Sequence, residues 1–349
     1  MNSRERVLRT FHFEPTDRAP FDLMEGCVWA ELLDDFRARY GLQEPAQVIE
    51  CLDPDFRWTY LQYLGPPPST PEPEPAQSED RTYTFKVAEG PLAHAESLSD
   101  LDAYPWPDPS WLGPADYASA RRRFPDKALV FCPGWMPLFW GACEAFGMQA
   151  ALVNMVQRPD LFEAFVQRRH AYVMDILARA APAAQGCCDI AWLGDDFAHQ
   201  GGMIASPALW RKRIKPYLAE EVSLLRQHDM LVLFHSCGAV RPVLDDLVEI
   251  GVNGLLVFQT TAKGMDAASI ARDFGGRLAF YGGVDIQRLL SFASPEDVET
   301  EVRANLRAFA GCGGYIVANS HHTVATIKGE NIEAMRRAAR ETTSTASLV

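Results

Sequence analysis

The sequence lacks the features that mark membrane-embedded and secreted proteins. No apolar run approaches the roughly 18 residues that a bilayer-spanning helix needs. The N-terminal stretch Met1–Phe11 is charged where a signal peptide would be apolar. The eight cysteines are scattered through 349 residues and do not form the dense pattern of a disulfide framework. We therefore expect no membrane segment, reduced thiols and a cytoplasmic location.

Other absences limit the ligands. No G-x-G-x-x-G and no P-loop motif follows a predicted strand, which argues against a dinucleotide or a nucleoside triphosphate. The net charge is −13 and no basic patch dominates, which argues against nucleic acids and anionic membranes. No Ser-His-Asp order can be defended, and Lys263, the nearest lysine to the predicted site, lies in a loop. What remains is an ordinary globular composition, with 48% hydrophobic and 23% charged residues.

Short apolar segments alternate with segments of helical spacing along the chain. Strands are predicted over residues 21–25, 56–63, 128–132, 189–193, 231–235, 253–258, 278–281 and 315–318. Helices are predicted over residues 3–12, 29–43, 114–123, 137–148, 159–182, 207–228, 241–250, 266–274, 294–311 and 330–340. Such alternation indicates parallel strands joined by helical crossovers. Eight strands favour a closed (β/α)8 TIM barrel, formed by a single domain over residues 1–349 that begins with a short helix.

An insertion at about residues 64–125 interrupts this order. It begins with the proline-rich stretch 65–75, which we interpret as a surface loop. Residues 81–87 and 92–95, separated by Glu89-Gly90-Pro91, predict a β-hairpin outside the main repeat.

The stretch Leu231–Gly238 holds the clearest candidate site. Its apolar residues up to Phe234 predict a buried strand, and His235 and Cys237 follow at once. In an extended backbone, residues i and i+2 point to the same side, so this imidazole and this thiolate can converge on one point. They are two ligands of a possible zinc site. The alternative is that the pair only packs in the interior.

In a barrel of this type, working residues lie at the carboxyl ends of the strands. At these ends the sequence offers Glu25, Cys132, Asp195, Asp196, His235, Cys237, Gln259, Asp285, His321 and His322. His321 can complete a His-Cys-His set with one open position, which is typical of catalytic zinc. The sequence does not decide between His321 and His322, and both can instead be loop residues that bond to the backbone. Cys312 is a rival ligand, but it precedes the last strand and so belongs to the opposite face.

Several motifs occur in a specific order and spacing in the C-terminal half. They are Gly194-Asp-Asp-Phe197, Ser206-Pro207, Lys215-Pro-Tyr217, His235-Ser-Cys-Gly238, Tyr281-Gly-Gly-Val-Asp285, Ser320-His321 and Glu330-Asn-Ile332. Through these motifs, residues 189–341 resemble the uroporphyrinogen decarboxylase superfamily, and specifically its corrinoid-dependent methyltransferase branch. The N-terminal half resembles the superfamily more weakly, through Ser3-Arg-Glu-Arg6 and Asp17-Arg-Ala-Pro20. The resemblance implies a TIM barrel.

The resemblance implies two different chemistries. True decarboxylases hold the carboxylates of a porphyrinogen with an arginine-rich N-terminal motif, whereas the matching stretch Leu23–Trp29 contains no arginine. The methyltransferases bind zinc through a His-x-Cys pair and a later cysteine. His235 and Cys237 match the pair, but His321 stands at the position of the later cysteine. We hypothesise that zinc held by one thiolate instead of two is a stronger Lewis acid, because the site keeps a net positive charge.

The expected function is therefore zinc-dependent transfer of a methyl group between a corrinoid and a small thiol or similar acceptor. Zinc would ionise the acceptor, Asp195 and Asp196 would orient it or move its proton, and Glu25 would complete or gate the open coordination position. Each acid is as readily a helix cap or an acceptor that orients a metal ligand. Cofactor binding is assigned to Gln259, Asp285 and Gly238.

The expected partners are a small-molecule methyl donor or acceptor and a corrinoid, either presented by a small corrinoid protein or bound free. A homodimer is left open. One alternative function is decarboxylation of a porphyrinogen or another acid, which the missing arginines oppose. The other is a non-catalytic protein that binds a corrinoid or a metal ion.

Overall fold

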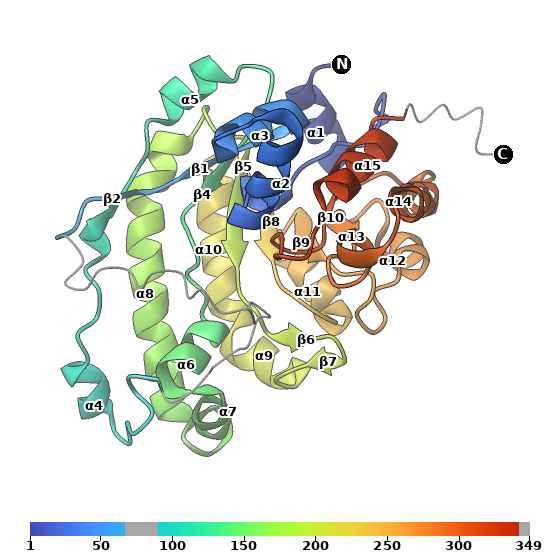
Figure 1. Ribbon diagram of the computed structural model, residues 1–349. Helices are drawn as coiled ribbons and strands as arrows, with labels where there is room; N and C mark the ends of the chain where they lie inside the picture. Colours follow the sequence, from blue (N-terminus) through green and yellow to red (C-terminus); the bar gives the residue numbers. More distant parts are fainter. Residues whose placement is uncertain (67–89, 342–349) are drawn as a thin grey trace.

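The computed structural model describes residues 1–66 and 90–341, and its centre is a curled parallel β-sheet surrounded by helices (Figure 1). Seven strands form the sheet, and their spatial order follows the chain. They are β1 (Phe56–Tyr60), β4 (Ala128–Cys132), β5 (Ile190–Gly194), β8 (Leu231–His235), β9 (Gly254–Phe258), β10 (Ala279–Val284) and β11 (Tyr315–Asn319). Every neighbouring pair is parallel, so all carboxyl ends meet at one edge.

Helices connect the strands and cover the outside of the sheet (Figure 1). They are α1 (Ser3–Phe11), α2 (Ala30–Tyr40), α3 (Pro45–Leu52), α4 (Leu98–Ala103), α5 (Tyr117–Arg123), α6 (Phe139–Phe146), α7 (Met148–Gln157), α8 (Pro159–Ala184), α9 (Pro207–Arg213), α10 (Lys215–Gln227), α11 (Leu244–Glu249), α12 (Ala267–Phe274), α13 (Leu289–Phe292), α14 (Pro295–Phe309) and α15 (Gly329–Ala339). Short 3-10 turns are η1 (Met24–Gly26), η2 (Pro109–Trp111) and η3 (Arg241–Val243). Among the helices of the described ranges, none is both long and apolar enough to cross a membrane.

The predicted first strand does not form, and the sheet is a half-barrel rather than a closed eight-stranded barrel. Only Phe21 bridges β11, where Val317 N donates to Pro20 O at 2.9 Å and Asp22 N donates to Val317 O at 3.0 Å. On the other side, Asp55 N donates to Phe21 O at 2.8 Å. The segment thus lies between the two edge strands, but η1 begins at Met24 and ends the extended backbone. The prediction of a parallel α/β fold is confirmed, and that of a closed barrel is wrong.

Apolar residues fill both sides of the sheet. Every residue of β4, β9, β10 and β11 is buried, which explains why these strands appear in the sequence as continuous apolar runs. One core cluster lies between the sheet and the outer helices, and a second lies inside the curl. Val7 and Phe11 belong to the inner cluster, so α1 covers the end at which the strands begin. The opposite end remains for polar residues.

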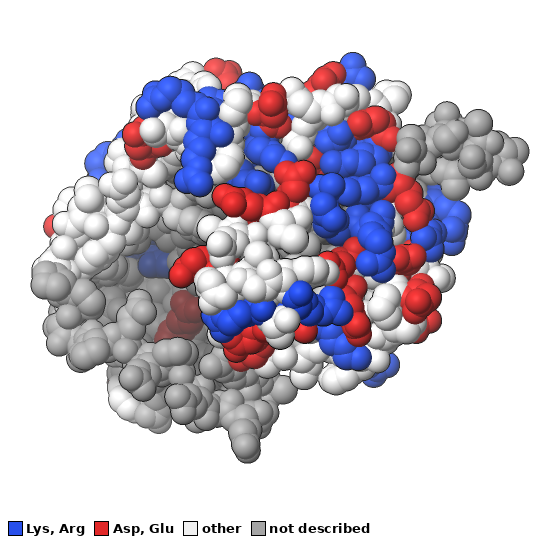
Figure 2. Space-filling view, turned by 45° about the horizontal axis from the view of Figure 1, so that its top comes forward, with Lys and Arg blue, Asp and Glu red and all other residues white. Residues whose placement is uncertain are grey.

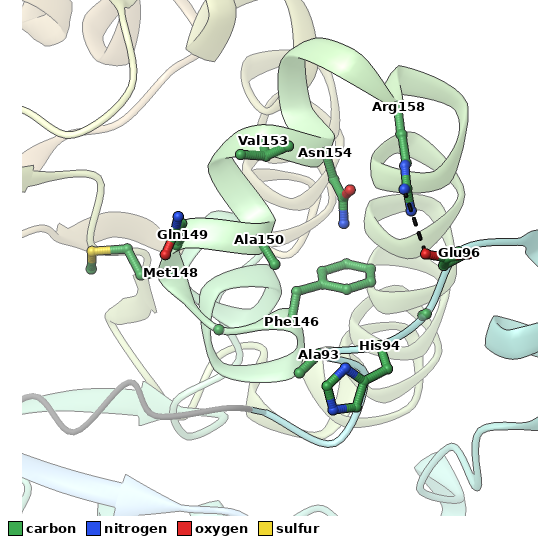
Figure 3. A pocket seen from close by; sticks show the side chains of 12 residues that line it. Ala93, His94, Glu96, Phe146, Met148, Gln149, Ala150, Val153, Asn154 and Arg158 are labelled. Atoms are coloured by element: carbon green, nitrogen blue, oxygen red, sulfur yellow. Dashed lines mark ion pairs between the residues drawn. The ribbon is translucent and has the colours of Figure 1, made fainter.

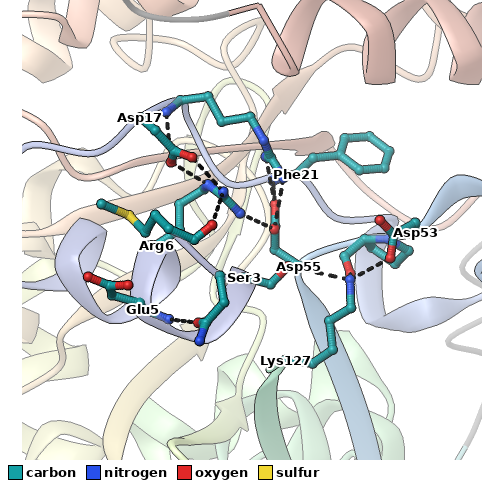
Figure 4. A network of polar contacts seen from close by, with 12 residues as sticks. Ser3, Glu5, Arg6, Asp17, Phe21, Asp53, Asp55 and Lys127 are labelled. Carbon is teal, nitrogen blue, oxygen red and sulfur yellow. Dashed lines mark hydrogen bonds and ion pairs between the residues drawn. The ribbon is translucent and has the colours of Figure 1, made fainter. Parts of the chain in front are cut away.

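A buried ionic network attaches the N-terminal segment to the end of the sheet at which the strands begin (Figure 4). Asp55 is fully buried, and its carboxylate lies 2.7 Å from Arg6 Nη1 and 2.8 Å from Arg18 Nη1. Arg6 also binds Asp17 at 2.8 Å. Two cations on one buried carboxylate provide the pairing that its burial requires.

Several local predictions differ from the structure. The helix predicted over 207–228 is two helices, because the chain breaks at Ile214 and the second helix begins at Lys215, with Pro216 in its first turn. Residues 92–95 form a turn rather than a strand, and residues 81–87 lie outside the described residues, as does most of the proline-rich loop. The strand predicted over 56–63 is divided into β1 and β2 (Gln62–Tyr63), and β2 pairs with β3 (Leu112–Gly113) in a small sheet. Helices α3, α4, α7 and α13 and the small sheet of β6 (Ala198–His199) with β7 (Gly202–Met203) were not predicted.

Basic and acidic side chains alternate on the outer surface. Figure 2 shows Lys and Arg next to Asp and Glu over the visible face. Arg303, for example, lies 2.5 Å from Glu341 and 3.0 Å from Glu299. Such exposed pairs contribute little to stability, but they neutralise much of the basic surface.

Candidate functional site

The carboxyl ends of β8 and β11 bring three of the predicted metal ligands together. His235 is the last residue of β8, Cys237 follows it, and His321 comes two residues after β11. One donor atom from each residue lies within 4.8 Å of the others. His235 is buried, and Cys237 and His321 are partly exposed. The sheet thus joins residues from distant parts of the chain into one donor set.

The separations in this set suit a zinc ion. His235 Nε2 lies 3.6 Å from Cys237 Sγ. In a tetrahedral site with ordinary Zn–N and Zn–S bonds, the nitrogen and the sulfur are about 3.5 Å apart. Imidazole and thiolate are also the donors that zinc prefers. The spacing of His235 and Cys237, and the chemistry of all three donors including His321, therefore fit this metal.

Two acids flank the ring of His235 on opposite edges. Asp196 Oδ1 lies 3.6 Å from Nε2 and accepts a hydrogen bond from Cys237 N at 2.7 Å. Glu25 Oε1 lies 3.6 Å from Nδ1. Asp196 is therefore on the edge that faces Cys237, and Glu25 is on the far edge. A carboxylate on the far edge favours a proton on Nδ1 and leaves Nε2 for a metal.

Glu25 and His322 form a charged pair beside this donor set. Their Oε2 and Nε2 atoms are 2.9 Å apart. Burial raises the pKa of Glu25, but the contacts with His235 and His322 outweigh it and lower that pKa to about 2. Burial lowers the pKa of His322, but contacts with Cys27 and Glu25 raise that pKa to about 10. At neutral pH the pair therefore carries one charge of each sign.

His321 and Cys237, the other two residues of the donor set, have pKa shifts that favour their neutral forms. Burial and electrostatic interactions with His235 and His322 lower the pKa of His321 to about 3, so the ring of His321 is neutral, the form that binds metals. Burial and the charge of Asp196 raise the pKa of the Cys237 thiol well above its usual range. A bound cation would reverse this effect and ionise the thiol.

A cavity of about 290 Å³ opens onto these residues. Its lining consists of Glu25, Tyr60, Cys132, Gly134, Trp135, Trp140, Trp192, Asp196, His235, His321 and His322. The ring centroids of Trp135 and Trp192 lie 5.3 and 5.8 Å from that of His235. An aromatic wall of this kind favours a small ligand and strengthens electrostatic interactions at the polar end.

The other predicted site residues lie away from this cavity. Both oxygens of Asp195 accept backbone hydrogen bonds at the start of α6, from Phe139 N at 2.7 Å and Trp140 N at 2.8 Å. Asp285 accepts backbone hydrogen bonds at the start of α13, including one from Arg288 N at 2.8 Å. Both acids thus act as helix caps, which was the alternative for Asp195.

Gln259 and Gly238 contact each other rather than the cavity. Gly238 N donates to Gln259 Oε1 at 2.7 Å. Gly238 has a φ of 83°, and a Cβ there would lie 2.6 Å from His199 O, so only glycine fits this turn. The pair shapes the loop that follows Cys237. The cofactor-binding role of Gln259, Asp285 and Gly238 stays a prediction.

Sequence reasoning missed part of the site. The aromatic residues of the cavity and Cys27 had no assigned role, although Cys27 and Glu25 stand two residues apart, as His235 and Cys237 do. A second group of metal-binding side chains, Glu25, Cys27 and His322, also has its donor atoms within 4.8 Å of one another. That shared spacing was the available signal.

A larger cavity, of about 490 Å³, lies elsewhere, between residues 93–96 and the helices α6 and α7 (Figure 3). It contains none of the predicted site residues. Arg158 and Glu96 pair across it at 3.8 Å, and most of its other lining is apolar or uncharged. Its side chains do not converge on a point as those at the end of the sheet do.

Known proteins resemble this chain as follows. The sequence model of the uroporphyrinogen decarboxylase (URO-D) family matches residues 141–342, more than half of the chain. No curated protein sequence matches it. A methyltransferase from Methanosarcina mazei has a similar structure, with a TM-score of 0.65 and 16% identity over 98% of this chain and 99% of that chain. At this identity the likeness shows the fold alone. A D-psicose 3-epimerase from Clostridium cellulolyticum H10 has a TM-score of 0.38 at 10% identity, covering 85% and 91% of the two chains, which is too low to carry an argument.

Proposed function

Because the chain belongs to the uroporphyrinogen decarboxylase family, we propose that it is a zinc-dependent methyltransferase of the corrinoid-dependent branch. The proposal is supported by the family, by the fold that it shares with a methyltransferase, and above all by the convergence of His235, Cys237 and His321 at one end of the sheet. These three residues would hold the zinc. The bound metal would lower the pKa of an acceptor thiol or similar nucleophile.

The surrounding residues have separate tasks in this proposal. Asp196 accepts a hydrogen bond from the backbone N–H of Cys237 and so fixes the position of that residue. Asp196 also lines the cavity, where it can accept the proton that the methyl acceptor loses. Glu25 orients His235 from the far edge of the ring instead of occupying the open coordination position. Trp135 and Trp192 exclude water from the reacting groups.

In this proposal the two substrates bind in different places, as the size of the cavity suggests. About 290 Å³ suits a small acceptor, because even drug-sized ligands occupy pockets of roughly 300–1,000 Å³. A corrinoid is much larger and would approach from the mouth, presented by a small partner protein. Porphyrinogen decarboxylation is less well supported, because no Lys or Arg is among the described residues that line the cavity.

Metal content and methyl transfer test the proposal together. The purified protein is analysed for zinc and mixed with methylcobalamin and a series of small thiols, and loss of the methyl–cobalt absorption is followed. We expect zinc and thiol-dependent demethylation in the wild type, and in Cys237→Ala and His321→Ala loss of the demethylation and of the zinc that these residues hold. Cys312→Ala is the matched control, because this thiol lies at the opposite end of the sheet. Full metal retention in both site variants would end the zinc proposal.

A further inference from the structure

We propose that Glu25, Cys27 and His322 form a second metal site, beside the one that His235, Cys237 and His321 provide. The inference goes beyond the proposed function and does not require it. Its starting point is geometric, since one donor atom from each of the three residues lies within 4.8 Å of the other two. A thiolate, an imidazole and a carboxylate are donors for zinc and similar transition metals rather than for calcium or magnesium.

The carboxylate of Glu25 has one oxygen that is available to bind a metal ion at this site. The Glu25 side chain is only 10% exposed. Its Oε1 is buried without a hydrogen-bond partner among the described residues, and 3.6 Å separates it from His235 Nδ1. A buried carboxylate oxygen without a partner is costly, and a cation bound to this carboxylate would offset the cost. Metal binding would also displace the proton that Oε2 shares with His322.

The backbone of this segment is held in an unusual shape that presents Glu25 and Cys27 together. Glu25 has a φ of 54°, which is uncommon for a residue with a side chain. Tyr60 donates a hydrogen bond from its hydroxyl to Glu25 O at 2.8 Å. Asn319, at the end of β11, accepts one from Met24 N at 2.9 Å and donates to His321 O. Asn319 therefore fastens the turn that carries Glu25 to the loop that carries His322.

Charge also favours a divalent ion here. A metal bound to Cys27 would ionise the thiol, so Glu25 and Cys27 would then supply two negative charges, which match a divalent cation and leave the second site neutral. The first site, with one thiolate and two imidazoles, keeps one positive charge when it holds the same ion. Glu25 would then bind one metal and orient His235, a ligand of the other, so the two sites would be linked through one carboxylate.

Counting metal ions in the intact chain tests this site. Native mass spectrometry after saturation with Zn²⁺ and removal of excess metal should find two ions per chain in the wild type. Cys27→Ser and His322→Gln should each find one. Saturation with Co²⁺ should show thiolate-to-cobalt charge-transfer absorption that falls by roughly half in Cys27→Ser, because one of two thiolate ligands is removed.

Matched controls separate this result from misfolding and from failure of the first site. Cys51→Ser removes an exposed thiol elsewhere and should keep both ions. His199→Gln does the same for a histidine outside both groups. Cys237→Ala should lose one ion and keep the one that depends on Cys27, and circular dichroism of each variant checks the fold. A wild-type chain with one ion, or Cys27→Ser with an unchanged count, would overturn the second site without affecting the proposed function.

Discussion

Two short segments carry metal-binding side chains at the same spacing, but on different backbones. His235 and Cys237 stand two residues apart at the end of strand β8. Glu25 and Cys27 also stand two residues apart, but Glu25 lies in the turn η1 with a left-handed φ of 54°. In the strand, simple alternation aligns the pair. In the turn, contacts from Tyr60 and Asn319 align it. Two residues that stand two positions apart can therefore present their metal-binding side chains together for different physical reasons.

The largest expected effect separates the two thiols by activity. Cys237→Ala should lower the rate of methyl transfer by more than about 100-fold, because loss of a metal ligand exceeds the 10–100-fold effects of residues that only orient ligands. Cys27→Ala should keep clearly more activity, since Cys27 does not belong to the donor set of His235, Cys237 and His321. Stopped-flow demethylation of methylcobalamin measures both. Equal losses in the two variants would mean that the strand pair has no special role.

A second substitution breaks the contacts on which only the turn depends. Asn319→Leu leaves Met24 N without its acceptor and should destabilise the fold by about 1–3 kcal/mol, as a buried donor without a partner does. It should also release the ion bound through Cys27 and keep the ion bound through Cys237. Urea unfolding and native mass spectrometry give the two readouts.

Asn305→Leu is the matched control for this substitution. Asn305 is also buried, and its side chain donates to Gly283 O at 3.1 Å. Its loss should cost similar stability and leave the metal count unchanged. If both variants lost the same ion, the turn would not depend specifically on Asn319.

A smaller effect tests whether Glu25 orients His235. Glu25→Gln keeps the size of the side chain but weakens the acceptor opposite His235 Nδ1. The affinity of the first site for zinc should fall about 10–100-fold, as measured by competition with a chelator. Asp285→Asn, at a helix start outside the cavity, should leave it unchanged. An unchanged affinity in Glu25→Gln would limit this residue to the second site.

The smallest expected effect is a contrast in pH dependence between His321 and His322 in chelator-treated protein. The pKa of His322 is raised to about 10, so its stabilisation is complete below the unfolded value of about 6.5 and is lost as the pH rises through 10. The pKa of His321 is lowered to about 3, so this histidine costs stability as the pH falls from about 6.5 to 3. Thermal unfolding across this range should show His322→Asn converging on the wild type at high pH. His321→Asn should gain relative to the wild type at low pH, and parallel curves would contradict the assignment.

Much of the sheet was predictable because its strands are buried on both faces. Residues 128–132 and 231–235 were predicted with the same bounds as β4 and β8, since continuous apolar runs between turns are typical of parallel strands. Segment 21–25 was also predicted as a strand, although Asp22 and Glu25 interrupt its apolar residues, and it forms one bridge because its last residues turn away at Met24. Whether a short apolar segment becomes a strand depends on its neighbours in space.

The candidate site also has one part that could be predicted from the sequence and another that could not. The pair His235 and Cys237 was evident from the sequence, because two residues on one strand need no other part of the chain to align them. Glu25 and His322 are 297 residues apart in sequence, and only the packing of the Glu25 turn against the end of β11, through Asn319, brings them to 2.9 Å. Asp195 and Asp196 are adjacent in sequence, yet one caps α6 and the other faces the cavity. The sequence by itself determined which donors exist and which strand presents a pair of them. The tertiary structure alone decided which distant donors meet, because that depends on how strands and loops pack in three dimensions.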